Sequence, residues 1–117
     1  MYTFGIDIGS TSSKAAIIRN GTELIRETVI PLGTGTIGPA QVRKAIFEEV
    51  DLQPESICYT IATGYGRLKC DYANEQISEL SCHAKGIHFL MPTVHTVIDI
   101  GGQDAKALSI DDNGALV

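Results

Sequence analysis

The sequence lacks the features of a membrane-spanning, secreted or nucleic-acid-coating protein. Its 117 residues contain no apolar run near the ~20 residues needed to cross a bilayer. The first residues show no basic region followed by an apolar stretch, so no signal peptide is predicted. Acidic residues outnumber basic ones by 14 to 9, and the formal charge of -5 argues against a surface that neutralises phosphates along a nucleic acid. Neither a membrane nor a nucleic acid is therefore expected as a partner.

Cysteine is also scarce. The three cysteines, Cys58, Cys70 and Cys82, are too far apart for a C-x-x-C ligand pair, and their odd number fits no closed disulfide framework. A reducing cytoplasm is the expected setting. Cys58 lies in an apolar run and Cys82 in a helical pattern, so both are predicted to be small buried hydrophobes. Cys70 precedes an aspartate in a predicted loop, which makes it the cysteine expected to be most exposed and most reactive.

Three β-prone runs open the chain. Residues 2–8 alternate large side chains with small or polar ones, and residues 14–19 form a second run. Residues 23–32 form the third run, which is the returning strand of a hairpin and is ended by Pro31. Asn20-Gly21 between the second and third runs is a strong hairpin signal. The first thirty residues therefore predict three antiparallel strands.

The rest of the chain alternates helical and strand patterns. The predicted elements are a helix over 40–50, a buried strand over 56–62, a helix over 77–91, a strand over 95–100 and a paired strand over 104–110. The apolar face of the first helix comprises Val42, Ala45, Ile46 and Val50. Gly86 weakens the second helix, so close packing against a neighbouring backbone is expected there. The order is β-β-β-α-β-α-β, with a new hairpin beginning at Asn113-Gly114.

One motif occurs twice. GIDIGSTSSKAA over residues 5–16 and VIDIGGQDAKAL over residues 97–108 align with a constant offset. The shift of 92 positions superimposes Asp7 on Asp99, Gly9 on Gly101 and Lys14 on Lys106. Two equivalent turns about one domain apart predict two similar domains that face each other across a nucleotide.

The first copy has the composition of a phosphate-binding turn. Gly9 permits a sharp bend and a close approach of backbone to ligand. Four hydroxyl residues follow, whose side chains and N–H groups suit phosphate oxygens: Ser10, Thr11, Ser12 and Ser13. Lys14 adds a positive charge, and Asp7 is a candidate for holding hydrated Mg²⁺. The alternative for a single copy is a strand end with a polar turn, and the second copy favours phosphate binding.

Several other polar residues have both a functional and a purely structural interpretation. Glu79 and His83 are four residues apart on the second helix, next to Cys82, which permits an ordinary helix pair or a metal or acid–base site. Arg67 follows a central strand and could meet a phosphate or carboxylate, or lie in a solvated turn. Gln103 and Asp104 follow the second turn and are candidates for orienting an attacking water or binding Mg²⁺ through water. His88 and His95 form no constellation and are interpreted as surface or packing residues.

Four blocks carry a family resemblance that covers nearly the whole chain. GIDIGSTSSK, ATGYGR, ISELSCHAKG and TVIDIGGQDAK, in this order, resemble the ATP-dependent activators of 2-hydroxyacyl-CoA dehydratases and their relatives in benzoyl-CoA reductases. That family lies within the superfamily of actin, sugar and acetate kinases and heat-shock chaperones. The resemblance implies an α/β fold of ribonuclease H-like, actin-like ATPase type with a mixed sheet. Residues 1–94 would be domain I, and residues 95–117 the first hairpin of a similar domain II.

The resemblance also implies a function. Such activators are homodimeric iron–sulfur ATPases in which one [4Fe-4S] cluster bridges two subunits, and ATP hydrolysis drives one-electron transfer to the dehydratase. By the family pattern, the ATP or ADP phosphates lie on residues 10–14 and on Gly101-Gly102. Asp7 and Asp99 lie near Mg²⁺, and Asp7, Gln103 and Asp104 are the candidate catalytic residues.

The resemblance stops short of the cluster. The family's cysteine blocks, of the N-D-K-C-A-A-G-T-G and S-T-C-T-V-F type, are absent from this sequence. The chain is therefore expected to be an N-terminal fragment that neither holds the cluster nor hydrolyses ATP usefully as a monomer. The alternatives are a kinase or acyl-phosphate enzyme of the same superfamily, or a non-catalytic module. Such a module is expected to dimerise through the apolar hairpin over residues 93–117.

Overall fold

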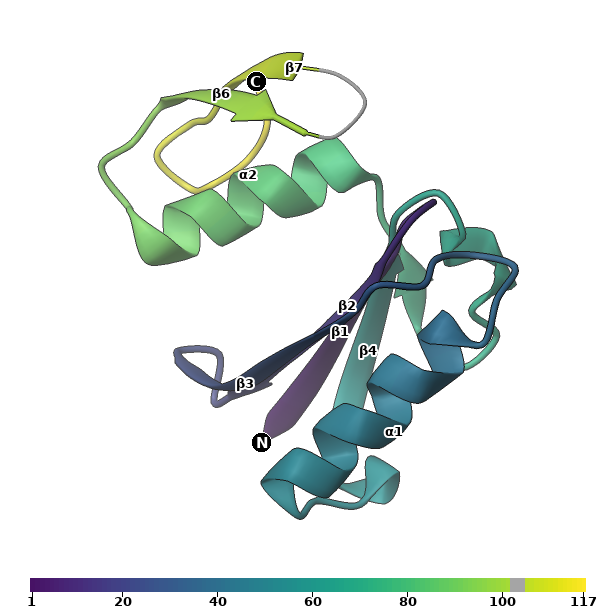
Figure 1. Cartoon of the computed structure of the whole chain (residues 1–117). Helices are drawn as coiled ribbons and strands as arrows, with labels where there is room; N and C mark the ends of the chain where they lie inside the picture. The colour runs from purple at the N-terminus through teal and green to yellow at the C-terminus, as the bar shows by residue number, and fades with distance from the viewer. Residues whose placement is uncertain (102–104) are drawn as a thin grey trace. The chain divides into compact units, whose positions relative to one another are not determined.

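The chain forms two structural units, each described here by itself. The computed structural model describes residues 1–101 and 105–117, and the units comprise Met1–Ile77 and Ser78–Val117 (Figure 1). The domain boundary predicted between residues 94 and 95 stays a prediction. Within the described ranges, no helix is both long and apolar enough to cross a membrane.

Unit 1 is built on a five-stranded mixed sheet. Its strands are β1 (Tyr2–Ile8), β2 (Ser13–Arg19), β3 (Glu23–Ile30), β4 (Ile57–Thr63) and the short β5 (Glu75–Gln76), in the order β3-β2-β1-β4-β5. β1 pairs antiparallel with β2 and parallel with β4, which confirms the predicted mixed sheet. The predicted hairpin is also confirmed: Asn20 and Gly21 both have positive φ, at 53° and 72°.

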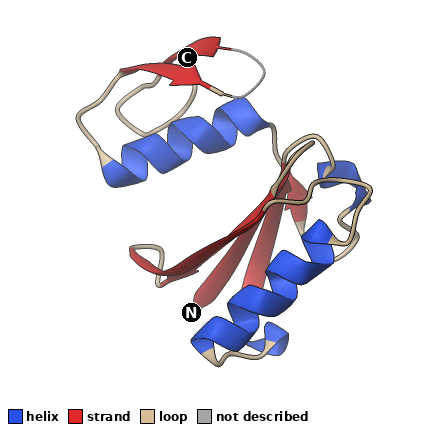
Figure 2. Cartoon of the chain, viewed as in Figure 1, coloured by secondary structure: helices blue, strands red, loops and turns tan. Residues whose placement is uncertain are grey.

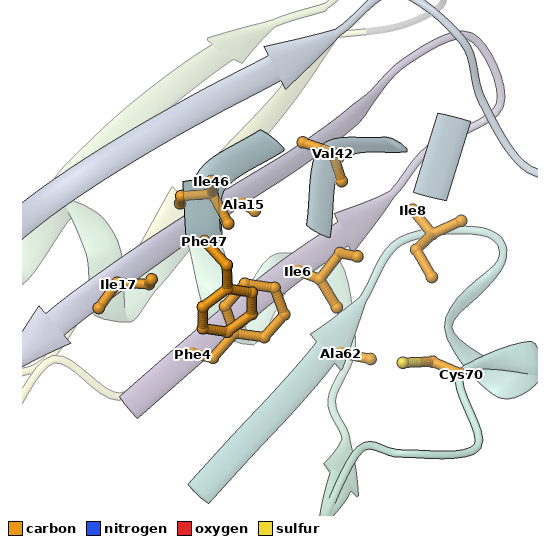
Figure 3. Close-up of a cluster of buried hydrophobic side chains, with 10 residues drawn as sticks. All are labelled: Phe4, Ile6, Ile8, Ala15, Ile17, Val42, Ile46, Phe47, Ala62 and Cys70. Carbon is orange, nitrogen blue, oxygen red and sulfur yellow. The ribbon is translucent and has the colours of Figure 1, made fainter. Parts of the chain in front are cut away.

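One helix, α1 (Gly38–Val50), lies along one face of this sheet (Figure 1). Alternate residues of β1 and β2 point toward it, because successive strand side chains point to opposite faces. The resulting core, shown in Figure 3, comprises Phe4, Ile6, Ile8, Ala15, Ile17, Val42, Ile46, Phe47, Ala62 and Cys70. The prediction that Val42 and Ile46 face the core is confirmed. Phe47 was not predicted, and its ring packs 5.4 Å from that of Phe4.

The cysteine predictions are wrong for two of the three residues. Cys70 is buried, and Figure 3 shows it beside Ala62. A 3-10 turn over Arg67–Lys69 reverses the chain just before Cys70 and returns it to the core. Cys58 is exposed, because only the carboxyl-terminal part of β4 is buried. All three cysteines are free thiols, and Cys82 is half-buried.

Unit 2 consists of helix α2 (Glu79–Leu90) and a hairpin of β6 (Thr96–Ile100) and β7 (Ala105–Ser109), which Figure 2 distinguishes by colour. Ser78 caps α2 by accepting a hydrogen bond from the N–H of Ser81, and Pro92 follows the end of the helix as predicted. One face of the hairpin, including the buried Leu108, packs toward α2. On the other face Ile98 and Ile100 are 73% and 80% exposed.

The sequence repeat is also a structural repeat. Asp7 lies directly opposite Lys14 in the β1–β2 pair, and Asp99 lies directly opposite Lys106 in the β6–β7 pair. Every paired residue of β6 and β7 corresponds to one of β1 and β2 at the same offset of 92 positions. Ile98 and Ile100 therefore occupy the positions of Ile6 and Ile8, which α1 buries in unit 1.

The predicted close packing at Gly86 is wrong. A Cβ built on Gly86 meets no atom within 4 Å, although the residue lies inside α2. We expect Gly86→Ala to raise the free energy of unfolding of unit 2 by about 0.5–1 kcal/mol, because alanine loses less backbone entropy in a helix. Hydrogen exchange of the α2 amides measures this change.

Gly21→Ala is the matched control for that variant. Its added Cβ also meets nothing within 4 Å, but the residue has a φ of +72° that alanine adopts only with strain. We expect this control to lower stability. A loss of stability in Gly86→Ala as well would contradict the open packing at that position.

Candidate functional site

The turn between β1 and β2, called here the first turn (residues 9–12), is tight and braced from outside. The N–H of Gly9 donates to the carbonyl oxygen of Ser12 at 2.9 Å. The N–H of Thr34, in the loop after β3, donates to the carbonyl oxygen of Gly9 at 2.8 Å. A Cβ on Gly9 would lie 2.9 Å from the Ser12 oxygen and 3.2 Å from Nζ of Lys14, so only glycine fits this bend without displacement.

The strand ends on the two sides of the first turn present a carboxylate and an ammonium together. Nζ of Lys14 donates to Oδ2 of Asp7 at 3.2 Å, across the antiparallel pair of strands. The Asp7 side chain is 24% exposed and that of Lys14 is 42% exposed, so both reach solvent. This arrangement suits a ligand that carries negative charge and a cation at once, which is the composition of a metal–phosphate complex.

Two buried polar atoms lie at the carboxyl ends of adjacent parallel strands. Asp7 pairs with Thr63 across β1 and β4, and neither Oδ1 of Asp7 nor Oγ1 of Thr63 has a hydrogen-bond partner among the described residues. A buried polar atom without a partner costs free energy, which a cation or ordered water nearby would offset. The residues therefore fit a hydrated Mg²⁺ held through the Asp7 carboxylate. Thr63 begins the turn after the central strand in which the sequence indicated ligand contacts, but the residue named there was Arg67.

The turn after β4 approaches the first turn through glycine. Gly64 has a φ of +92°, and a Cβ there would lie 2.5 Å from the carbonyl oxygen of Ile8 and closer still to Oδ1 of Asp7. The N–H of Gly66 donates to the same Ile8 oxygen at 2.8 Å. Nη1 of Arg67 donates to the carbonyl oxygen of Gly64 at 3.0 Å, so part of its guanidinium holds its own turn. The turn after β4 is thus held against the end of β1, next to the Asp7 side chain.

The four predicted hydroxyl residues divide into two groups. Ser10 and Thr11 are exposed and Ser12 is half-buried, so these three line the open side of the first turn. Ser13 is fully buried, and its Oγ donates to the carbonyl oxygen of Leu32 at 2.8 Å. Its hydroxyl therefore holds the loop after β3, and only its backbone remains for a ligand.

The second turn, after β6, belongs to unit 2. Gly101 is exposed, and the predicted residues Gly102, Gln103 and Asp104 lie outside the described residues. Nδ1 of His83 on α2 lies 2.9 Å from Oδ2 of Asp99. A cleft of about 390 Å³ runs beside this pair, lined by Cys82, His83, Gly86, Ile87, Val97, Ile98, Asp99 and Leu108.

The remaining histidines and acidic residues that the structure describes do not gather into a metal site. Within residues 1–101 and 105–117, no three His, Cys, Asp or Glu side chains gather as a metal site, so the metal reading of Glu79, Cys82 and His83 gains no support. The interpretation of the other two histidines as surface or packing residues agrees with the structure: the half-buried His88 packs against Gly114, whereas His95 is exposed, with its Nδ1 2.9 Å from the carbonyl oxygen of Ile110.

The class of protein follows from the fold and the site together. Three antiparallel strands, a covering helix and a parallel fourth strand, with a glycine turn that carries Asp7 and Lys14, form a fragment of an actin-like ATPase domain. The chain belongs to the BadF/BadG/BcrA/BcrD ATPase family, whose model matches residues 4–117.

Individual relatives agree with this assignment. An activator of lactoyl-CoA dehydratase from Anaerotignum propionicum is 54% identical over 116 residues, covering 99% of this chain and 45% of that protein. The solved structure of the activator of the 2-hydroxyisocaproyl-CoA dehydratase from Clostridium difficile, with bound ADPNP, is 50% identical with a TM-score of 0.93, covering 100% of this chain and 44% of that one. Component A of the (R)-2-hydroxyglutaryl-CoA dehydratase from Acidaminococcus fermentans is 47% identical with a TM-score of 0.93, covering 99% and 45%. The chain thus spans slightly less than half the length of these relatives.

Proposed function

We propose that the chain is the N-terminal, nucleotide-binding part of an ATPase that activates a 2-hydroxyacyl-CoA dehydratase by one-electron transfer. The observation that carries the nucleotide part is the first turn, where the Asp7 carboxylate has one oxygen on Lys14 and one buried oxygen without a partner. The dehydratase part rests on the functions of the three relatives named above, each of which is at least 47% identical to this chain.

In this proposal the first turn binds the phosphates of ATP or ADP. The hydroxyls of Ser10, Thr11 and Ser12 and the N–H groups of the turn donate to phosphate oxygens, because they are the accessible donors there. Lys14 neutralises part of the phosphate charge, and Asp7 holds Mg²⁺ through water. Bound Mg–ATP would supply the phosphoanhydride bond whose hydrolysis drives the one-electron transfer.

We assign the residues of the second turn the roles of their counterparts in the first turn, using the shift of 92 positions that aligns the two copies of the motif. Asp99 takes the position of Asp7 near the cation, and the N–H groups of Gly101 and Gly102 contact phosphate. Gln103 and Asp104 orient the attacking water. The equal register of the two hairpins supports this assignment, because it gives the carboxylate and lysine of each turn the same spacing.

The cysteines of the chain do not fit an iron–sulfur cluster. Such a cluster takes four cysteine thiolates, so a cluster shared by two subunits needs two accessible cysteines from each. Unit 1 has one accessible cysteine, Cys58, because Cys70 is buried, and unit 2 has the half-buried Cys82 alone, so neither unit offers a pair of accessible cysteines. The electron-transfer step, the homodimer and the contact with the dehydratase are therefore proposed for the whole protein, with cluster ligands outside this chain. The free thiols fit a reducing cytoplasm.

Calorimetric titration with Mg–ATP, with the oligomeric state recorded in the same buffer, tests the nucleotide site. We expect a dissociation constant tighter than about 100 µM. Lys14→Met is expected to weaken binding about tenfold, because it removes the side-chain cation beside the first turn while keeping an unbranched side chain that is one atom shorter. Equal binding by the variant, or no heat with the unaltered chain, would contradict the assignment of the phosphate site to this turn.

A further inference from the structure

We propose that His83 is a positioning residue for the second turn, where its Nδ1–H holds the Asp99 carboxylate in the orientation that meets the hydrated cation of a bound metal–nucleotide. This inference rests on the proposed function and adds a residue to it. It gives a specific role to the side chain of His83 in the ISELSCHAKG block. From the sequence alone, His83 could belong either to an ordinary helix pair or to a metal or acid–base site.

The contact joins two elements of unit 2. Nδ1 of His83, on the second turn of α2, lies 2.9 Å from Oδ2 of Asp99, on the last-but-one residue of β6. The two side chains are 37% and 35% exposed, so the pair is partly shielded yet open to solvent on one side. The carboxylate keeps its second oxygen for another partner, since one imidazole nitrogen engages only one oxygen.

The first turn has no equivalent of this histidine. Asp7 corresponds to Asp99 by register, but α1 covers the opposite face of the β1–β2 pair, where Ile6 and Ile8 point. In unit 2 the helix lies on the face that carries the carboxylate, as the His83 contact requires. The second turn therefore has a restraint on its carboxylate that comes from a helix, whereas the carboxylate beside the first turn is held by Lys14 of the paired strand.

The surroundings leave room for a hydrated ligand. The cleft beside the pair measures about 390 Å³, and Gly86, one turn after Cys82 on α2, adds no side chain to its wall. A carboxylate at the rim of such a cleft can rotate about its terminal torsion unless a partner restrains it, because that torsion is broad for aspartate. Hydrogen bonds to metal-ligating carboxylates fix their orientation, and losing such a partner typically lowers metal affinity about 10- to 100-fold.

The choice of ring nitrogen makes the inference testable by conservative replacement. An asparagine side chain places its amide nitrogen near the position of imidazole Nδ1, whereas a glutamine places it near Nε2. We therefore expect His83→Asn to retain the hydrogen bond to Asp99, and both His83→Gln and His83→Ala to lose it. A residue needed only to fill space would not separate the asparagine variant from the glutamine variant in this way.

The test measures Mn²⁺ affinity in the presence of ATP by electron paramagnetic resonance. We expect His83→Ala and His83→Gln to weaken Mn²⁺ binding about tenfold, and His83→Asn to remain within about threefold of the unaltered chain. Glu79→Gln, one turn earlier on the same helix, is the control and should leave the affinity unchanged. Circular dichroism of each variant verifies that α2 is intact before affinities are compared.

A second readout is independent of metal and nucleotide. Nitrogen-15 spectra of the imidazole ring should show a proton on Nδ1 of His83, and Asp99→Asn should shift that resonance. Unchanged Mn²⁺ affinity in His83→Ala, or equal affinities in the asparagine and glutamine variants, would overturn the inference alone. If the unaltered chain binds no Mn–ATP, the proposed function fails and this inference fails with it.

Discussion

Gly64→Ala is expected to lower the free energy of unfolding of unit 1 by about 3 kcal/mol. The φ of +92° costs an alanine about 1–2 kcal/mol, and its Cβ would overlap the carbonyl oxygen of Ile8, which adds about 1–3 kcal/mol of strain. Because the same Cβ would also press on Oδ1 of Asp7, we expect the variant to lose nucleotide binding where it still folds. Urea denaturation followed by circular dichroism gives the change in stability.

Gly35→Ala separates the two causes of that loss. Gly35 also has a positive φ, +78°, but a Cβ there meets nothing within 4 Å. We expect this control to cost only about 1–2 kcal/mol, the price of the backbone conformation alone. Equal losses in the two variants would show that the close approach of the β4 turn to Ile8 and Asp7 contributes nothing.

Asp7→Asn is expected to weaken Mg–ATP binding about 100-fold with little change in stability. The amide keeps the shape of the side chain but removes the charge that holds the hydrated cation, and charge-assisted contacts of this kind are worth about 10²-fold or more. Its partner Lys14 is 42% exposed, so loss of the ion pair should cost at most about 1 kcal/mol. Calorimetry measures the first effect and urea denaturation the second.

Glu55→Gln controls for the loss of one negative charge. Glu55 is exposed on a short turn before β4 and should leave nucleotide affinity unchanged. If Asp7→Asn binds Mg–ATP as tightly as this control, Asp7 has no part in holding the cation. If it instead unfolds the chain, the carboxylate is structural rather than a ligand.

The sequence predicted those parts of the fold that depend on local patterns. Alternation marked β1, Asn20-Gly21 marked the first hairpin, and the 3.6-residue spacing of Val42 and Ile46 marked the buried face of α1. The two-residue strand β5 has no pattern long enough to detect. Cys70 was misjudged because the 3-10 turn that returns it to the core depends on packing against Ala62, which a loop-like sequence does not reveal.

The candidate site was predictable to the same extent. The repeated motif pointed to Asp7 and Lys14, and the register of β1 and β2 does bring them together. It did not reveal that Ser13 turns its hydroxyl inward to Leu32, because inward and outward positions depend on which face α1 covers. The contact of His83 with Asp99 joins residues 16 positions apart on a helix and a strand, and only tertiary packing determines it.

The equal register of the two hairpins restricts how such turns can diverge. Between the paired Asp and Lys, one turn has the residues IGSTSS and the other has IGGQDA, so the two share few residue types but the same number of residues. One inserted residue on one side of either turn would slip the strand pairing and send the lysine to the other face of its hairpin, away from the carboxylate. Apart from Gly9, which the bend of the first turn requires, substitutions in these turns are therefore tolerable where insertions and deletions are not. The number of residues in each turn is the property that must stay constant.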